Sequence, residues 1–252
     1  MSRYNETFVI EDDDTSIIAR ETRNALLNSA EYWEWYSREA LNIRTIGELN
    51  AGAIPKSSNI IAVGTIDHVE YWMKHMKIPI PAPLDIPVEL EAFLGERGPC
   101  QRGPSSDLYA EKSAVDIHYK DISMSKGASR MVERGEIIGG KNDRSLCRIT
   151  KWVEMISEWR VFVKNNKVIG VCNYRGDPLM FPNSGTIAEM ISAYTLAPAA
   201  YTLDVAVIMD GKTIIVECHN FYACGLYGLC FTDAVDMWYR WWKYYTSKCG
   251  VL

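Results

Sequence analysis

Acidic, histidine and asparagine side chains gather between residues 201 and 228, where the sequence reads YTLDVAVIMDGKTIIVECHNFYACGLYG. Asp204 lies in the first apolar run, and Glu217, His219 and Asn220 lie at the end of the second. Carboxylate and amide oxygens are the ligands that Mg²⁺ prefers. These four side chains therefore form a candidate metal site, provided that the two runs lie side by side.

Two adjacent strands, 201–209 and 213–217, are predicted to bring these residues together. The dipeptide Asp210-Gly211 between them is typical of the tight turn of a β-hairpin. Apolar residues alternate with Asp204, so we expect the aspartate to project from a half-buried strand. For an arbitrary hairpin, two solvated acids on an exposed face would be the commoner arrangement.

The order of strand, acid, hairpin turn, apolar strand and second acid resembles the metal-binding end of ATP-grasp enzymes. That family usually has Glu-x-Asn at this point, whereas this chain has Glu217-Cys218-His219-Asn220. The resemblance implies ATP and Mg²⁺ as cofactors, with Asp204 and Glu217 as metal ligands. Either His219 replaces the asparagine or Asn220 supplies it one residue later.

The sequence EMISEWRVFV, residues 154–163, resembles a second part of the same fold. By this resemblance the backbone of Glu154 and Met155 would contact adenine, and Glu158 would bind the ribose hydroxyls. Arg160 lies one strand step from Glu158 on the same face and would reach phosphate or substrate. The alternative is an exposed cross-strand Glu/Arg pair of little energetic value.

One ATP-grasp clade is defined by two arginines and a lysine, is common in bacteriophages and is predicted to contain RNA ligases. The segment P..LDIP.EL..FLGER, residues 81–97, resembles its leading domain. In that clade Arg160 would be one arginine, and Arg175, in the sequence NYRG, is the candidate for the second. The resemblance assigns Lys120, Arg160 and Arg175 to catalysis.

Lysines that could bind phosphate occur in VDIHYKDISMSKGASRMV, residues 115–132. By resemblance, Lys120 at a strand end and Lys126 with Gly127 in a small-residue loop would contact the nucleotide phosphates. The family often has Lys-Pro where this chain has Lys120-Asp121. A neighbouring acid favours the ammonium form, so we expect Lys120 to clamp phosphate rather than attack it as a neutral amine. No Walker A pattern is present.

The predicted fold class is α+β, an ATP-grasp fold with a small leading α/β domain. The leading domain is expected over 1–104, with a buried parallel strand at 60–64 and a helix capped by Thr65 or Asp67. The ATP-grasp domain is expected over 105–252, with the lysines in 105–153 and the metal site in 154–252. Between the helices, four prolines predict an extended crossing segment at 78–87.

Composition limits the possible partners. The net charge is −5 and the pI near 5.5, so the protein as a whole does not attract nucleic acid. A local basic groove is still compatible with this net charge. No apolar run is long enough to cross a membrane, and the acidic N-terminal segment does not resemble a signal peptide. Seven scattered cysteines indicate a reduced, cytoplasmic protein, in the host cytoplasm if the source is viral.

Two other patterns have structural explanations that we favour. Cys218, Cys224 and Cys230 are evenly spaced, but no Cys-x-x-Cys pair supports a structural zinc site. The aromatic sequence MWYRWWKYY, residues 237–245, could stack on bases, yet its apolar residues have helical spacing. We expect them to pack in the core, on a helix capped by Thr232.

The function predicted from the sequence is an ATP- and Mg²⁺-dependent ligase, with an RNA end as its substrate by resemblance to the clade. A carboxylate–amine ligase of the ordinary ATP-grasp kind is the alternative enzyme. A nucleotide-binding protein without catalysis, such as a viral sponge for a signalling nucleotide, is the alternative from another class. The pair Asp204 and Glu217 argues against the sponge, because a protein that only binds nucleotide has less need of metal ligands.

Overall fold

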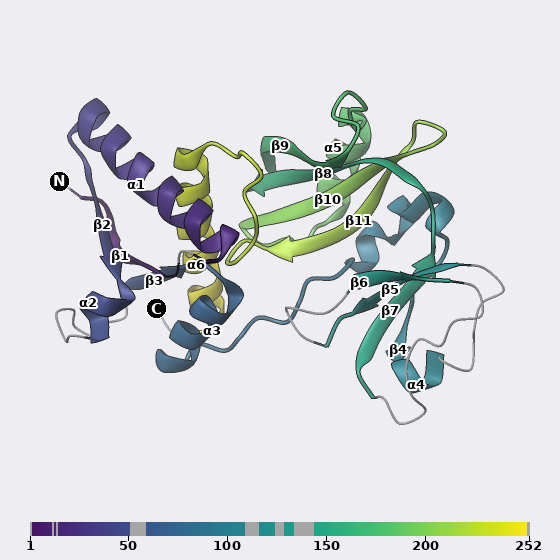
Figure 1. Ribbon diagram of the computed structural model, residues 1–252, viewed down its shortest axis with the longest axis horizontal. Coiled ribbons are helices and arrows are strands. Elements are labelled where there is room, and N and C mark those ends of the chain that lie inside the picture. The colour runs from purple at the N-terminus through teal and green to yellow at the C-terminus, as the bar shows by residue number, and fades with distance from the viewer. Residues whose placement is uncertain are drawn as a thin grey trace.

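Three β-sheets organise the described part of the chain (Figure 1). The computed structural model describes residues 2–11, 13, 15–50, 59–108, 116–123, 129–133 and 144–250. One sheet has three strands and belongs to the N-terminal part, and the other two have four strands each. The mixture of helices and antiparallel sheets agrees with the predicted α+β class. None of the described helices is long and apolar enough to span a membrane.

The N-terminal sheet is parallel, with strand order β2-β1-β3. Its strands are β1 (Ser2–Ile10), β2 (Ala40–Thr45) and β3 (Ile60–Val63), and its helices are α1 (Ile17–Ser37), α2 (Ile46–Asn50) and α3 (Ile66–His75). Every residue of β3 is buried, which confirms the predicted buried parallel strand. Thr65 is the N-cap of α3, because its hydroxyl accepts a hydrogen bond from the His68 amide.

The sheet that carries Lys120, called here the lysine sheet, is antiparallel with strand order β4-β7-β5-β6. Its elements are β4 (Gln101–Pro104), α4 (Ser105–Leu108), β5 (Ile117–Asp121), β6 (Ser129–Val132) and β7 (Leu146–Lys151). Strand β4 pairs with β7, so this sheet begins at Gln101, just before the start expected for the ATP-grasp domain at residue 105. Lys126 and Gly127 lie outside the described residues.

The sheet that carries the acids, called here the acid sheet, is antiparallel with strand order β11-β10-β8-β9. Its elements are β8 (Met155–Lys164), β9 (Lys167–Gly176), α5 (Ser184–Ala193), β10 (Ala200–Ile208) and β11 (Thr213–Asn220). The hairpin predicted at Asp210-Gly211 is confirmed as β10 and β11, and β8 and β9 form a second hairpin. Asn165 and Asn166 have φ of 48° and 59°, the left-handed conformation that a two-residue turn between twisted strands requires.

An extended segment connects the N-terminal part to the two four-stranded sheets. Residues 78–84 have no regular structure, as their prolines predicted, and in Figure 1 they cross from α3 toward β11. The 3₁₀ helix η1 (Val88–Arg97) follows, with Leu90 and Leu94 buried. The amide of Cys218 donates a hydrogen bond to the carbonyl of Asp85, so the end of this segment pairs with the outer edge of β11.

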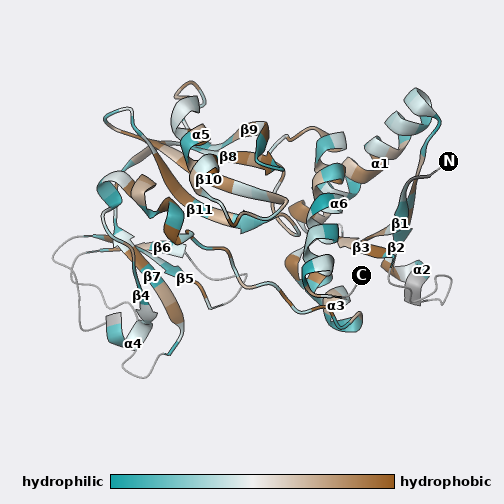
Figure 2. Cartoon of the chain, turned by 180° about the vertical axis from the view of Figure 1, so that it is seen from behind, coloured by the Kyte–Doolittle hydropathy of each residue, from teal (hydrophilic) through white to brown (hydrophobic). Residues whose placement is uncertain are grey.

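The C-terminal helix α6 (Phe231–Lys248) packs against the N-terminal part of the chain (Figure 1). One continuous core contains residues of β1, α1, β3, α3 and α6. Figure 2 shows hydrophobic residues on β3, which belongs to this core, and on β8 and β10, most of which belong to a second core with α5 and η1. The start predicted for α6 was wrong, because Cys230, not Thr232, is its N-cap residue.

The tryptophans of α6 are core residues, as the helical spacing predicted. Val235, Trp238, Trp241 and Trp242 are all buried in the shared core. Their rings are therefore covered and do not form a platform for bases.

We predict that Trp241→Ala lowers the free energy of unfolding by about 3–5 kcal/mol, because it removes a large side chain that is 1% exposed. Arg240→Ala, next to it on the exposed side of α6, is the control and should change the free energy by less than about 0.5 kcal/mol. Denaturant unfolding followed by circular dichroism measures both. Equal effects of the two substitutions would contradict the assignment of this stripe to the core.

Candidate functional site

Asp204 and Glu217 lie directly opposite each other on the paired strands β10 and β11. His219 follows two residues after Glu217 and therefore projects from the same face of β11. One ligand atom from each of the three residues can be chosen so that all lie within 4.8 Å of one another. Among the described residues this is the group of acids, histidines and cysteines that is compact enough to hold a metal ion.

Asp204 is deeply buried, and the expectation of a half-buried strand was wrong. Every residue of β10 is buried, and Asp204 itself is 2% exposed. Arg160 of β8 compensates the charge, because its Nε and Nη2 donate hydrogen bonds of 2.8 and 2.7 Å to the two carboxylate oxygens. Burial alone would raise the pKa of Asp204, but Arg160 and His219 lower it below its usual value.

Glu217 forms an ion pair with the lysine sheet. Lys120 Nζ lies 2.6 Å from Glu217 Oε2, although the two residues are 97 positions apart in the sequence. Burial alone would raise the pKa of Glu217, and His219 and Lys120 lower it well below its usual value. The glutamate is therefore ionised, and the structure places the predicted lysine beside the predicted metal ligands.

The imidazole of His219 faces both carboxylates. Its Nε2 lies 3.0 Å from Glu217 Oε1 and 3.5 Å from Asp204 Oδ2, and neither contact has the geometry of a hydrogen bond. Burial opposes its protonation, yet the two acids raise the pKa of His219 to about 9, so the ring is positively charged at neutral pH. One carboxylate oxygen each from Asp204 and Glu217 and the Nε2 of His219 are thus close enough to coordinate one cation. Its positive charge would replace that of the protonated imidazole.

Asn220 does not join this group. Its Nδ2 donates a hydrogen bond to the Ala82 carbonyl at 3.1 Å, and its Oδ1 accepts one from Trp241 Nε1 at 3.2 Å. The side chain therefore ties β11 to the crossing segment and to α6. Of the two candidates for the third metal ligand, His219 is the one that lies beside the acids.

Glu158 and the two predicted arginines extend the site along β8 and β9. Glu158 accepts hydrogen bonds from Tyr174 and from Arg175 Nη1, at 2.9 and 2.8 Å. Arg175 is 69% exposed, so it is the arginine that solvent reaches. The guanidinium of Arg160 is occupied by Asp204 and by the Gly225 carbonyl, and it lies 4.9 Å from the centre of the Tyr227 ring.

The segment predicted to contact adenine connects the two four-stranded sheets. Residues 152–154 link β7 to β8; Glu154 is exposed, and Met155 is the first residue of β8. Met155 packs against a small apolar cluster of residues from β10, β11 and the linker between β7 and β8. The buried members of this cluster are Val153, Ala206, Ile208, Ile214 and Val216.

Sequence reasoning missed two buried arginines between the sheets. Arg148 of β7 is 0% exposed, and its Nε donates a hydrogen bond to Asp85 at 2.6 Å. Arg97 of η1 donates hydrogen bonds to the carbonyls of Ile215 and Val216. The four central residues of β7 are all buried, and no pattern in the sequence indicates that this strand is buried on both faces.

The cysteines do not form a metal site in the described part of the chain. All seven are free, with Cys218 and Cys224 buried and Cys230 exposed. Burial raises the pKa of the Cys224 thiol to about 12, which disfavours the thiolate that zinc requires.

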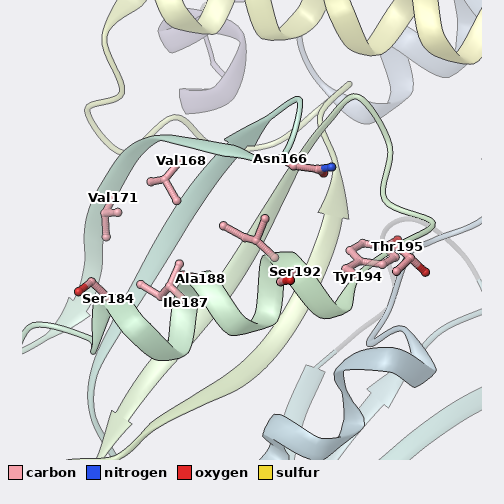
Figure 3. A pocket seen from close by; sticks show the side chains of 10 residues that line it. Asn166, Val168, Val171, Ser184, Ile187, Ala188, Ser192, Tyr194 and Thr195 are labelled. Carbon is pink, nitrogen blue, oxygen red and sulfur yellow. The ribbon is translucent and has the colours of Figure 1, made fainter.

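Two hollows border the acid sheet. The smaller, of about 60 Å³, is lined by residues that include Asp85, Lys120, Glu217 and His219 and therefore opens at the candidate site. The larger, of about 780 Å³, lies between β9 and α5 and has no charged residue in its lining. Figure 3 shows Ile187 and Ala188 of α5 facing Val168 and Val171 of β9 across it. The candidate metal ligands and Lys120 therefore face the smaller hollow and not the larger one.

The fold and this arrangement of acids and lysine define the class of protein. Residues 112–237, half of the chain, match an ATP-grasp domain family, the second family of the clade that is named for two arginines and a lysine. The chain belongs to the ATP-grasp family, which confirms the expected superfamily. ATP-grasp ligases use ATP and Mg²⁺, and these are the cofactors that the sequence predicted.

Solved structures share the fold at low sequence identity. D-alanine–D-alanine ligase from Bacillus anthracis superposes with a TM-score of 0.57 at 10% identity, over 96% of this chain and 99% of that one. N5-carboxyaminoimidazole synthetase from Staphylococcus aureus has a TM-score of 0.57 at 10% identity, over 94% and 78%. The ATP-grasp ligase PsnB with a minimal precursor has a TM-score of 0.53 at 13% identity, over 93% and 99%. Among curated proteins, none matches the chain significantly.

We predict that two substitutions affect metal binding differently. Glu217→Gln should weaken the binding of both Mg²⁺ and Co²⁺ by about tenfold or more, because a carboxylate ligand is lost. His219→Asn should weaken Co²⁺ binding more than Mg²⁺ binding, because later transition metals favour imidazole nitrogen and Mg²⁺ favours oxygen.

Calorimetric titration with each ion measures these affinities. Asp210→Asn is the matched control, because this acid lies in the turn of the same hairpin. Unchanged affinities in both Glu217→Gln and His219→Asn would show that the ions bind elsewhere.

Proposed function

We propose that this protein is an ATP- and Mg²⁺-dependent ligase that transfers the terminal phosphoryl group of ATP to an acceptor. The observation that carries the proposal is the meeting of Lys120 with Asp204, Glu217 and His219, which come from different sheets. Phosphoryl transfer needs metal ligands and a cation for the phosphate oxygens in one place. A protein that only stored nucleotide would not need this combination.

Each residue has a role that follows from its position. Asp204, Glu217 and His219 would hold the divalent cation, which neutralises charge on the outer phosphates. Lys120 Nζ is close enough to the metal ligands to leave Glu217 and bind a phosphate oxygen instead. Arg160 keeps Asp204 ionised and oriented, since both carboxylate oxygens accept its hydrogen bonds.

The nucleotide itself would lie along the same face of the acid sheet. Glu158 is placed to accept hydrogen bonds from ribose hydroxyls, as the resemblance implied, once Arg175 or Tyr174 moves aside. Met155, which is half-buried at the edge of the apolar cluster, would contact adenine. Lys126 and Gly127, for which we also propose contacts to phosphate, would complete the clamp.

For the acceptor, the geometry favours a carboxylate that is joined to an amine. In that reaction the carboxylate oxygen attacks the terminal phosphorus, ADP leaves, and an amine then displaces phosphate from the acyl phosphate. The lysine and the two arginines described at the site are each paired with an acid, so they form no continuous positive surface for a polyanion. The named neighbours, among them D-alanine–D-alanine ligase and PsnB with its precursor, agree with this choice.

An RNA end is the second candidate acceptor. Arg175 is the observation that favours it, because this arginine is exposed while its Nη1 lies 2.8 Å from Glu158 at the site. Lys120 Nζ lies 2.6 Å from Glu217 Oε2, so it would have to leave this ion pair before it could attack the α-phosphate. Ligation through a lysine–AMP intermediate is therefore the less favoured route for either acceptor.

We predict that turnover of ATP releases ADP and labels no lysine. Incubation with α-labelled ATP, Mg²⁺ and a panel of carboxylates with amines, or of RNA ends, should yield labelled ADP. Lys120→Met should reduce turnover by about 10²-fold or more, because the phosphates lose a positioned cation. Lys151→Met, at the exposed end of β7 in the same sheet, is the control and should turn over normally.

Two results would contradict this proposal. An acid-stable AMP label that disappears in Lys120→Met would make this lysine a nucleophile and put RNA ligation first. Tight binding of ATP without turnover of any acceptor would favour the nucleotide-binding alternative.

A further inference from the structure

Asp85 contacts both four-stranded sheets at once. Its carbonyl accepts a hydrogen bond of 2.9 Å from the Cys218 amide, on the outer edge of β11. Its carboxylate accepts hydrogen bonds from Arg148 Nε of β7, at 2.6 Å, and from Arg102 Nε of β4, at 3.1 Å. A single residue of the crossing segment therefore joins the acid sheet to the lysine sheet.

Both ends of this connection lie next to the proposed ATP site. Cys218 is the residue between Glu217 and His219. Arg148 is the register partner of Lys120 on the neighbouring strand, so their side chains project side by side from the same face of the lysine sheet. The contact between Asp85 and Arg148 thus connects the strand beside Lys120 to the strand that carries Glu217 and His219.

The electrostatics of Arg148 make this contact specific. The guanidinium is fully buried, and its two Nη atoms have no hydrogen-bond partner among the described residues. Asp85 is the acid with which Arg148 forms an ion pair in this part of the structure. A buried charge with one compensating partner holds that partner in place, because separation would leave the charge uncompensated.

The backbone of Asp85 is also constrained. Its φ is 48°, in the left-handed region that residues other than glycine rarely adopt. Such a conformation persists where the surrounding contacts fix it, and here the contacts are the Cys218 amide and two arginines. The crossing segment is held a second time where Asn220 donates its hydrogen bond to Ala82.

We propose that Asp85 and Arg148 are positioning residues that hold Lys120 in register with the metal ligands of the acid sheet. The proposal rests on the proposed function, in which ATP contacts both sheets. All three metal ligands lie on the acid sheet, so metal binding alone does not require the register. Binding of ATP together with the metal does require it.

The contacts of Arg97 allow this idea to be tested without separating the sheets. Arg97 donates hydrogen bonds to the carbonyls of Ile215 and Val216 in β11 and to Thr150 Oγ1 in β7. We therefore expect Arg97 to keep the sheets together when Asp85 and Arg148 are changed. Replacing both partners also avoids leaving one buried charge alone.

The test uses the double variant Asp85→Asn with Arg148→Met in the full chain. Its affinity for Mn²⁺, followed by electron paramagnetic resonance, should stay within about twofold of the wild type, because the ligands are unchanged. Its affinity for ATP in Mg²⁺ should fall by about 10–100-fold, because misplacement by about 1 Å is costly at a site built from two elements.

The control is the double variant Lys164→Met with Asp236→Asn. This pair has an N–O distance of 2.7 Å and joins β8 to α6 away from the site, so both affinities should be retained. Unchanged ATP affinity in the Asp85/Arg148 variant would overturn the proposal. Loss of Mn²⁺ affinity as well as ATP affinity would also overturn it, since that result means a general structural role.

A second measurement does not depend on ATP. Mn²⁺ held by Asp204, Glu217 and His219 should broaden the amide NMR signals of β5 around Lys120 as well as those of β10. In the Asp85/Arg148 variant the broadening in β5 should decrease while that in β10 stays the same. If the wild type binds Mn²⁺ but not ATP, the proposed function fails, and equal broadening of β5 in both proteins would separately refute the positioning role.

Discussion

A buried carboxylate and a half-buried one can lie side by side on paired strands and stay ionised only if positive charge lies close to both. Asp204 and Glu217 are register partners, and their mutual repulsion would raise both pKa values in the absence of cations. Arg160 compensates the first and Lys120 the second, while His219 stands between them. This compensation keeps both acids ionised, which is the form that binds a metal ion.

The source of each cation explains the arrangement of the rest of the molecule. Arg160 comes from β8, the neighbour of β10, so the order of strands in the acid sheet places it beside Asp204. Lys120 comes from the other sheet, so the ion pair with Glu217 forms only when the two sheets are held together. The crossing segment and η1 hold them, through the contacts of Asp85 and Arg97.

Local signals in the sequence predicted much of the fold. The dipeptide Asp210-Gly211 indicated the hairpin of β10 and β11, and the spacing of tryptophans indicated a buried helix face. These features depend on neighbours within a few residues, so a single sequence contains them. Strand β4 and the 3₁₀ form of η1 were missed, because short elements of this kind have no strong periodicity.

The candidate site was predicted only in part, because several of its contacts join residues that are far apart in the sequence. Resemblance identified Asp204, Glu217 and Lys120, but the burial of Asp204 depends on Arg160, 44 residues earlier in the chain. The contact of Arg148 with Asp85 spans 63 residues and joins two sheets. Such pairs are fixed by tertiary packing, and no spacing within one strand or helix reveals them.

The central claim is that Asp204, Glu217 and His219 hold the metal ion that, with Lys120, binds the phosphates of ATP. Crystals grown with MnCl₂ and a non-hydrolysable ATP analogue test it most directly, by anomalous scattering from manganese. The account predicts an anomalous peak among the three side chains, with Lys120 Nζ moved from Glu217 to a phosphate oxygen. A nucleotide bound with its manganese elsewhere, while Lys120 still contacts Glu217, would contradict it.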